Sequence, residues 1–215
     1  MAFELVVVGT SLGGLHALEV LLAGLPDDFP ASVAIVQHRH KDSQNTLSFF
    51  LQQHSALPLK EPEDKEVIVP GHIYLAPADY HLLVEAPDCA AEKHRPYFSL
   101  STEAPVEYAR PSIDVLFESA ADAYTKKVIG VILTGSNQDG AQGLAKIKAR
   151  GGLTVVQAPT TAESSLMPEA ALAKALRGDS AQSEGIATAT VDRILLLSEI
   201  APFVVNLVNR HTQLE

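Results

Sequence analysis

The chain has 215 residues, 47% hydrophobic and 20% charged, which is enough for one substantial core, so we expect residues 1–215 to form a single domain. Its formal net charge of −10 at pH 7, with no long run of Lys or Arg, argues against a nucleic-acid partner. Cys89 is the only cysteine, which excludes an internal disulfide and a cysteine-based zinc site and favours a cytoplasmic protein.

Four apolar, β-branched runs alternate with helical patterns along the chain, as expected of βαβ units on a buried parallel sheet. These runs are Leu5–Val8, Val33–Val36, Val128–Leu133 and Leu153–Val156. Between them, short strand-like pieces broken by prolines predict a small antiparallel insertion, at His72–Ala76, His81–Glu85 and Tyr97–Ser101. The expected fold class is therefore α/β, a three-layer, doubly wound, mainly parallel sheet with a small antiparallel β insertion.

Three helices can be placed by their end signals and apolar spacing. Pro111-Ser112 opens a helix whose apolar face has the 3.6-residue period. That face consists of Ile113, Leu116, Phe117, Ala120, Ala121 and Tyr124. Pro168 suits the first position of an Ala-rich helix that ends near Arg177-Gly178, and Val191–Asn209 predicts a last helix, bent or broken at Pro202. Glu199 and Pro202 interrupt this apolar stretch, so we expect no membrane span.

The first strand runs into a G-x-S-x-G turn, Gly9-Thr-Ser-Leu-Gly13, followed by a helical pattern. This arrangement predicts a nucleophile elbow, because glycines at both ends permit a tight bend that projects the Ser11 hydroxyl at the sheet's carboxyl edge. The Leu12 N–H would point at the same place. Alternatively, Ser11 only caps a helix behind a phosphate-binding turn. A dinucleotide site is disfavoured, since G-x-G-x-x-G would need glycine at position 11.

A histidine and an aspartate follow two other predicted strands. His38 comes directly after the strand at Val33–Val36, and Asp139 follows the strand at Val128–Leu133, so both should reach the same sheet edge as Ser11. Each has an alternative interpretation. Asp139 would suit the N-cap of a helix at Ala141–Ala149. His38 and His40 would share one face of an extended segment and bind a metal, although no third ligand of matching spacing is evident.

Several ordered motifs together resemble the catalytic domain of chemotaxis protein-glutamate methylesterases. The motifs are V-V-G-T-S-L-G-G, I-V-Q-H, P-G-H-I-Y-L-A-P, R-P-S-I-D-V-L-F, G-V-I-L-T-G-S-N-Q-D-G-A-Q-G-L and A-x-x-x-x-M-P. The resemblance covers Leu5 to about Arg177 and implies a triad of Ser11, His38 and Asp139, with no metal or other cofactor. It also implies that backbone N–H groups of Leu12 and Ser136 bind the oxyanion.

The activity implied by the resemblance is hydrolysis of glutamyl γ-methyl esters on methylated chemoreceptors, with release of methanol and with glutamine deamidation as a further reaction. The residue types fit a serine esterase, in which His38 accepts the Ser11 proton and Asp139 fixes the histidine tautomer. The order Ser, His, Asp along the chain differs from the Ser, Asp, His order of α/β-hydrolases. The partner expected from this resemblance is a methylated chemoreceptor-like protein.

The chain departs from the family pattern around the expected site. The family's T-G-M-G-x-D-G has Ser136 and Asn137 in place of Met and Gly, and its H-R-P begins with Ala109. A backbone donor survives a side-chain change, so the oxyanion site is expected to persist with altered access. Arg110 and Met167 are the expected substrate contacts, and a solvated surface arginine is the alternative interpretation of Arg110. The alternative function is a catalytically weakened binding or scaffold domain of a signalling system.

Family members usually carry an N-terminal receiver domain, for which 215 residues leave no room. The chain is therefore expected to be a standalone esterase or a piece of a larger protein.

Overall fold

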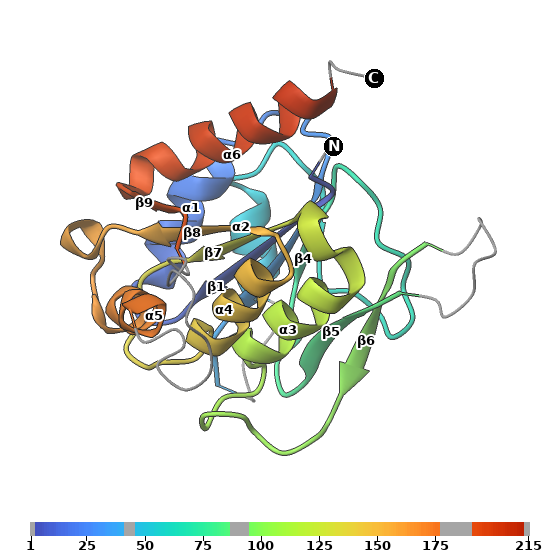
Figure 1. Cartoon of the computed structure of the whole chain (residues 1–215). Coiled ribbons are helices and arrows are strands. Elements are labelled where there is room, and N and C mark those ends of the chain that lie inside the picture. The colour runs from blue at the N-terminus through green and yellow to red at the C-terminus, as the bar shows by residue number, and fades with distance from the viewer. Residues whose placement is uncertain (1–2, 41–45, 87–94, 177–190, 213–215) are drawn as a thin grey trace.

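The computed structural model describes residues 3–40, 46–86, 95–176 and 191–212 (Figure 1). The helices are α1 (Gly14–Ala23), α2 (Thr46–Gln52), α3 (Ile113–Tyr124), α4 (Ala141–Ala149), α5 (Leu166–Leu176) and α6 (Leu197–Thr212). The strands are β1 (Leu5–Thr10), β2 (Ser32–Gln37), β3 (Leu59–Lys60), β4 (Ile73–Leu75), β5 (His81–Glu85), β6 (Tyr97–Ser101), β7 (Val128–Ile132), β8 (Leu153–Gln157) and β9 (Arg193–Leu195).

In this described part, seven strands form one sheet in the order β3-β4-β2-β1-β7-β8-β9, and every neighbouring pair is parallel. The chain moves from β1 to β2 and β4 on one side, then crosses back so that β7 pairs with the other side of β1. The strand order thus reverses between β1 and β7. At such a switch point the loops after the strands diverge and leave room for a ligand.

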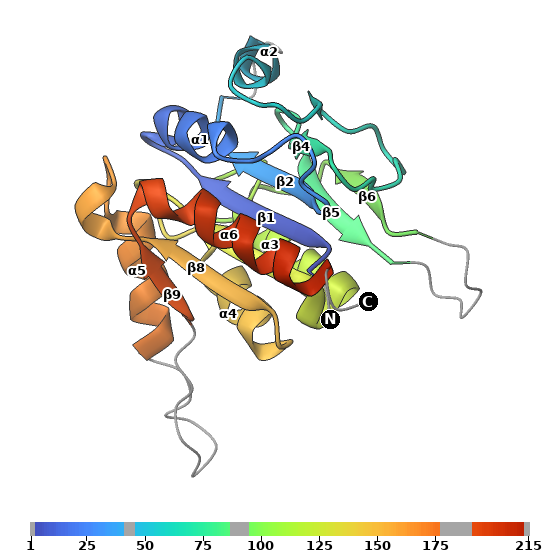
Figure 2. The same cartoon turned by 90° about the horizontal axis from the view of Figure 1, so that it is seen from above.

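Helices cover both faces of the sheet, giving three layers (Figures 1 and 2). Apolar side chains of α1 and α6, with Leu51 of α2, form one cluster with the strands; those of α3, α4 and α5 form the other. The central strands β1 and β7 are buried along their whole length, which explains why they are continuous apolar runs in the sequence. The α/β fold class is confirmed.

The antiparallel insertion is smaller than the sequence predicted. β5 and β6 form a separate two-stranded antiparallel sheet that packs beside α3, as expected. The predicted piece at His72–Ala76 is not part of it, because β4 lies between β2 and β3 in the main sheet. Its three residues are all buried, which fits an interior parallel strand.

The helix at Pro111-Ser112 is confirmed, with the Ser112 side chain as N-cap and all six predicted apolar residues buried. At the C-terminal end the prediction is partly wrong. Arg193–Leu195 is strand β9, and α6 starts only at Leu197 and continues through Pro202 without a break. Pro202 lies in the second turn of α6 and removes one intrahelical hydrogen bond, which costs helix stability but does not end the helix.

Helix α5 begins at Leu166, so Pro168 is its third residue, where no intrahelical donor is needed. The predicted end at Arg177-Gly178 lies outside the described residues. Among the helices that the structure describes, none combines the length and apolar character needed to cross a bilayer.

Candidate active site

Ser11 stands directly after β1, on the tight turn that leads into α1. Gly13, the N-cap of α1, has φ 78, a left-handed conformation that favours glycine. Gly9 faces a different constraint, since an added Cβ would lie 2.3 Å from Ile113 Cγ2 at the start of α3. Gly13 therefore allows the bend that the G-x-S-x-G pattern predicted, whereas Gly9 allows the close approach of α3, which the pattern did not predict.

The loop after β7 lies against this turn. A Cβ added to Gly135 would be 3.0 Å from Ser11 Cβ and 2.4 Å from Met167 Cε, so the loop is packed between the two residues. Two backbone hydrogen bonds fix Gly135: its N–H donates to Ser164 O at 3.1 Å, and its carbonyl accepts from Met167 N–H at 2.9 Å.

Two backbone donors beside Ser11 have no acceptor. Among the residues that the structure describes, the N–H groups of Leu12 and Ser136 make no hydrogen bond. Both residues line the same pocket as Ser11. Free N–H groups held by a rigid turn and a fixed loop are the arrangement that stabilises a developing oxyanion. This supports the roles that the resemblance implied for Leu12 and Ser136.

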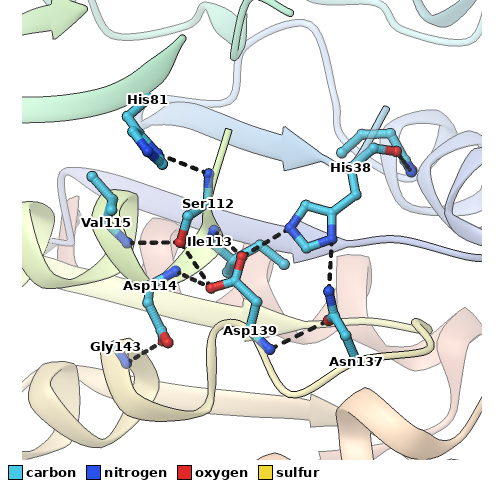
Figure 3. A network of polar contacts seen from close by, with 10 residues as sticks. His38, His81, Ser112, Ile113, Asp114, Val115, Asn137, Asp139 and Gly143 are labelled. Carbon is cyan, nitrogen blue, oxygen red and sulfur yellow. Dashed lines mark hydrogen bonds and ion pairs between the residues drawn. The ribbon is translucent and has the colours of Figure 1, made fainter. Parts of the chain in front are cut away.

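His38 and Asp139 are in direct contact. His38 Nε2 lies 2.8 Å from Asp139 Oδ2, although the two residues come from the ends of different strands, β2 and β7 (Figure 3). The histidine side chain is 12% exposed and the aspartate is fully buried. A buried carboxylate bonded to a partly exposed imidazole is the orienting pair of a serine hydrolase.

The Asp139 carboxylate is also bound by the N-terminal end of α3. Ile113 N–H donates to Oδ2 at 2.7 Å, Asp114 N–H donates to Oδ1 at 2.9 Å, and the Ser112 hydroxyl donates to Oδ1 at 2.9 Å. Burial alone would raise the pKa of Asp139. The hydrogen bonds from His38 and from the Asp114 and Ile113 N–H groups outweigh it and place the pKa below its ordinary value.

Asp139 is therefore not the N-cap of its own helix, the alternative that its position before Ala141–Ala149 left open. Gly140 is the N-cap of α4, and no side chain caps it. The carboxylate turns away and binds the first N–H groups of α3 instead, where the helix dipole favours a negative charge.

The other nitrogen of His38 faces Asn137. His38 Nδ1 lies 3.1 Å from Asn137 Nδ2, and Asp139 N–H donates to Asn137 Oδ1 at 3.3 Å (Figure 3). In the described part of the chain, Ser11 Oγ makes no hydrogen bond to His38. The direct Ser-His contact of an assembled triad is thus not formed in this conformation. Ser11 and His38 instead face a common pocket.

This pocket has a volume of about 770 Å³ and lies at the carboxyl edge of the sheet. It is bounded by the nucleophile turn, the start of α1, the loop after β2 and the loop after β7. The lining residues are Ser11, Leu12, Gly13, Gly14, Leu15, His16, Glu19, Gln37, His38, Arg39, Leu47, Ser136 and Glu163.

The expected substrate contacts lie elsewhere. Arg110 does not line the pocket; its guanidinium binds Asp79 Oδ1, with Nη2 at 2.6 Å and Nε at 3.0 Å, and also the carbonyls of Thr102 and Glu103. Met167 is 1% exposed and packs beneath Gly135. Arg110 thus links Asp79 to the segment of Thr102 and Glu103, and Met167 supports the loop after β7.

The sequence did not point to two residues that contact His38 or Asp139. Asn137 was judged only as a change in the loop, and Ser112 only as the start of a helix. The motifs that contained them were visible, but their contacts with His38 and Asp139 depend on how separate loops meet in space.

The sequence also did not point to Arg39, whose side chain is 6% exposed. Nη2 donates to Glu61 Oε1 and to Ala76 O, both at 2.7 Å, while Nε and Nη1 have no partner in the described structure.

For metals, no group of three or more His, Cys, Asp or Glu suited to an ion occurs in the described ranges.

Comparison with known proteins agrees with this geometry. The family model described as CheB methylesterase matches residues 6–201. The chain belongs to this family. A crystal structure of the CheB methylesterase catalytic domain of Thermotoga maritima superposes with a TM-score of 0.84 at 30% identity, covering 97% of this chain and all of that one.

Curated relatives are also similar to the chain in sequence. A protein of Leptospira interrogans is 42% identical over 207 residues, which make up 96% of each chain. A protein-glutamate methylesterase/protein-glutamine glutaminase of Caulobacter vibrioides is 38% identical over 201 residues. The present chain matches 94% of its own length but spans only 53% of the Caulobacter protein.

Proposed function

We propose that this member of the CheB methylesterase family is a serine esterase that hydrolyses glutamyl γ-methyl esters on a chemoreceptor-like protein. The observation that carries the proposal is the contact between His38 and the buried Asp139, in the same site as Ser11 on its elbow. The names of relatives such as the Caulobacter protein supply the substrate class.

In the proposed reaction, Ser11 Oγ attacks the ester carbonyl carbon while His38 takes the hydroxyl proton. Because Nε2 is bound to Asp139, Nδ1 is the nitrogen that accepts this proton. The proton then passes to the departing methoxide, and methanol leaves an acyl-serine. Water, deprotonated by the same nitrogen, attacks the acyl group, and Ser11 recovers its proton as the glutamate carboxylate is released.

Two groups of backbone and side-chain contacts stabilise charge along this path. The free N–H groups of Leu12 and Ser136 are the proposed oxyanion donors, and losing one such donor typically costs about 10²–10³ in rate. Asp139 stabilises the imidazolium. Its carboxylate is kept ionised by the contacts at the start of α3, so it remains an acceptor for His38 Nε2–H.

Methanol release from a methylated chemoreceptor tests the proposal. Ser11→Ala should lower the rate by more than about 10⁴-fold, because the acyl intermediate cannot form. A variant that retains full turnover would exclude Ser11 as the nucleophile.

His38→Ala paired with His40→Ala provides the matched comparison. His38→Ala should abolish turnover, whereas His40→Ala should keep most of it, because His38 is the proposed base and its ring contacts Asp139. Equal damage from both changes, together with inhibition by chelators, would instead support the metal interpretation.

The names of the relatives also favour a second reaction, deamidation of glutamine side chains. The same nucleophile and oxyanion donors would serve, with ammonia leaving in place of methanol. Ammonia release from an unmethylated receptor, lost in Ser11→Ala, is the expected result. If neither methanol nor ammonia is released and the protein still binds the receptor, the esterase proposal is wrong and the scaffold function is favoured.

A further inference from the structure

Three residues of the site form a closed ring of contacts, two between side chains and one to a backbone N–H. His38 Nε2 lies 2.8 Å from Asp139 Oδ2, His38 Nδ1 lies 3.1 Å from Asn137 Nδ2, and Asn137 Oδ1 accepts from Asp139 N–H at 3.3 Å (Figure 3). Both ring nitrogens of His38 are therefore engaged by residues of a single loop, the one that follows β7.

The ring of contacts fixes which atoms carry protons. Asp139 N–H is a donor, so it faces the oxygen of the Asn137 amide and turns the NH₂ group toward His38. An NH₂ group only donates, so His38 Nδ1 must present its lone pair. The ring proton of neutral His38 is then on Nε2, where it is donated to Asp139.

This is the tautomer that a general base needs, but its basic lone pair is occupied. An imidazole nitrogen has one lone pair in the ring plane, so Nδ1 cannot accept fully from Asn137 and from Ser11 at once. In agreement, Ser11 Oγ makes no hydrogen bond to His38 in the described structure.

We propose that the Asn137 amide caps the catalytic base in the free protein, and that Ser11 is activated only when this amide is displaced from His38 Nδ1. The inference rests on the proposed function, because the proposed reaction makes His38 Nδ1 the base. Asn137 acts through His38 and is a positioning residue: its NH₂ group matches the tautomer that Asp139 fixes and occupies Nδ1 until the pocket is filled.

The Asn137 amide is held less firmly than the Asp139 carboxylate. Asp139 is fully buried and held by four donors, whereas Asn137 is only half-buried. Its oxygen contact of 3.3 Å is longer than the usual 2.7–3.2 Å of N–H···O hydrogen bonds. A substrate entering the pocket can therefore exchange this amide without disturbing the His38–Asp139 pair.

Reaction of Ser11 with a small organophosphonate tests the cap without any receptor. Asn137→Ala should increase the labelling rate about two- to tenfold, the factor expected when one neutral hydrogen bond no longer has to be broken. Gln138→Ala is the matched control. It removes an exposed side chain from the same loop and should leave the rate unchanged.

The variant Asn137→Asp distinguishes a cap on His38 Nδ1 from a purely structural role of Asn137 in the loop. A carboxylate only accepts, so it would bond to His38 only when Nδ1 carries a proton, and a protonated Nδ1 cannot take the Ser11 proton. Labelling by Asn137→Asp should therefore be slower than in the wild type, opposite in direction to Asn137→Ala. If both variants slow labelling equally, Asn137 only supports the loop and the proposal is overturned.

The ¹⁵N spectrum of the His38 ring gives an independent measurement. In Asn137→Ala the Nδ1 resonance should move toward that of an unbonded acceptor, while the Nε2 resonance stays that of a protonated donor. An unmoved Nδ1 resonance overturns the cap, whatever the activity. Absence of labelling in every protein would count against the proposed esterase, and the Nδ1 resonance would still decide on the cap.

Discussion

Two carboxylates at the start of α3 have opposite electrostatic surroundings. The pKa of Asp139 is below its ordinary value despite burial, because four donors point at it. Burial raises the pKa of Asp114 to about 6, with the charges of Asp139 and Glu118 adding to the effect and the Gly143 and Gly140 N–H groups opposing it. The fold thus stabilises one anion beside His38 and disfavours a second.

This difference predicts a pH dependence of stability. An acid with a raised pKa binds its proton more tightly in the folded state than in the unfolded state. The free energy of unfolding therefore falls as pH rises from about 4 to 6, and above pH 6 it changes no further through Asp114. Asp114→Asn removes this loss and keeps an oxygen for Gly143 N–H. The variant should gain up to ~3 kcal/mol over the wild type at pH 8.

Denaturant unfolding of both proteins between pH 4 and 8 measures the effect. The two curves should converge as pH falls toward 4, because Asp114 is then protonated in the folded wild type and begins to be protonated in the unfolded wild type as well. Curves that stay parallel over the whole range would show that the Asp114 charge carries no penalty.

At the scale of elements, β1 and α3 meet at Gly9. Gly9→Ala would place a methyl group 2.3 Å from Ile113 Cγ2, and Ile113 also donates its N–H to Asp139. The substitution should lower the free energy of unfolding by about 1–3 kcal/mol through overpacking. It should also lower esterase activity, because the displaced helix start no longer holds the acid.

A double-mutant cycle with Ile113→Ala provides the control. On that background the new methyl group has space, so Gly9→Ala should cost clearly less than in the wild type. If Gly9→Ala costs the same in both backgrounds, contact with Ile113 is not the cause.

Which elements the sequence predicted depends on their length and burial. β1 and β7 are continuous apolar runs, and α3 has both a cap at Ser112 and a full apolar face, so each was predicted. β4 was predicted as a strand but assigned to the wrong sheet, and β9 was expected to be helical, because three residues show no period and their pairing is set by the main sheet. The break expected at Pro202 does not occur, because burial of neighbouring residues such as Ile200 and Val204 holds α6 together despite the lost hydrogen bond.

The same limit applies to the candidate site. Ser11, His38 and Asp139 could be predicted because each follows a strand, and parallel strands deliver their ends to one edge. The partners of these residues could not. The contacts of Asn137 with His38, and of Ser112 with Asp139, join segments 99 and 27 residues apart through loop conformations that no local pattern encodes.

At the scale of the whole molecule, the two apolar clusters share one sheet. Alternate residues of the same strands supply both, as with Val7 on one face and Val8 on the other. Neither cluster can be lost without exposing the strands of the other. The chain is therefore predicted to unfold in one transition, as a single domain does.

Leu22→Ala and Leu144→Ala test this prediction from opposite faces, since both leucines are fully buried. Each should lower the free energy of unfolding by about 2–5 kcal/mol. Tyr74 and Tyr124 belong to the cluster opposite Leu22. Leu22→Ala should nevertheless shift tyrosine fluorescence and circular dichroism to the same midpoint; separated midpoints would indicate two independently stable halves.

The outer strands of the main sheet have a consequence for self-association. β3 has two residues and β9 has three, and exposed Lys60 and Arg193 lie on them. Exposed sheet edges are templates on which another copy can add a strand, and short, positively charged edges hinder that addition. Within the described structure, the sheet is thus poorly suited to fibril-like growth, which protects a chain whose centre is made of long, very apolar strands.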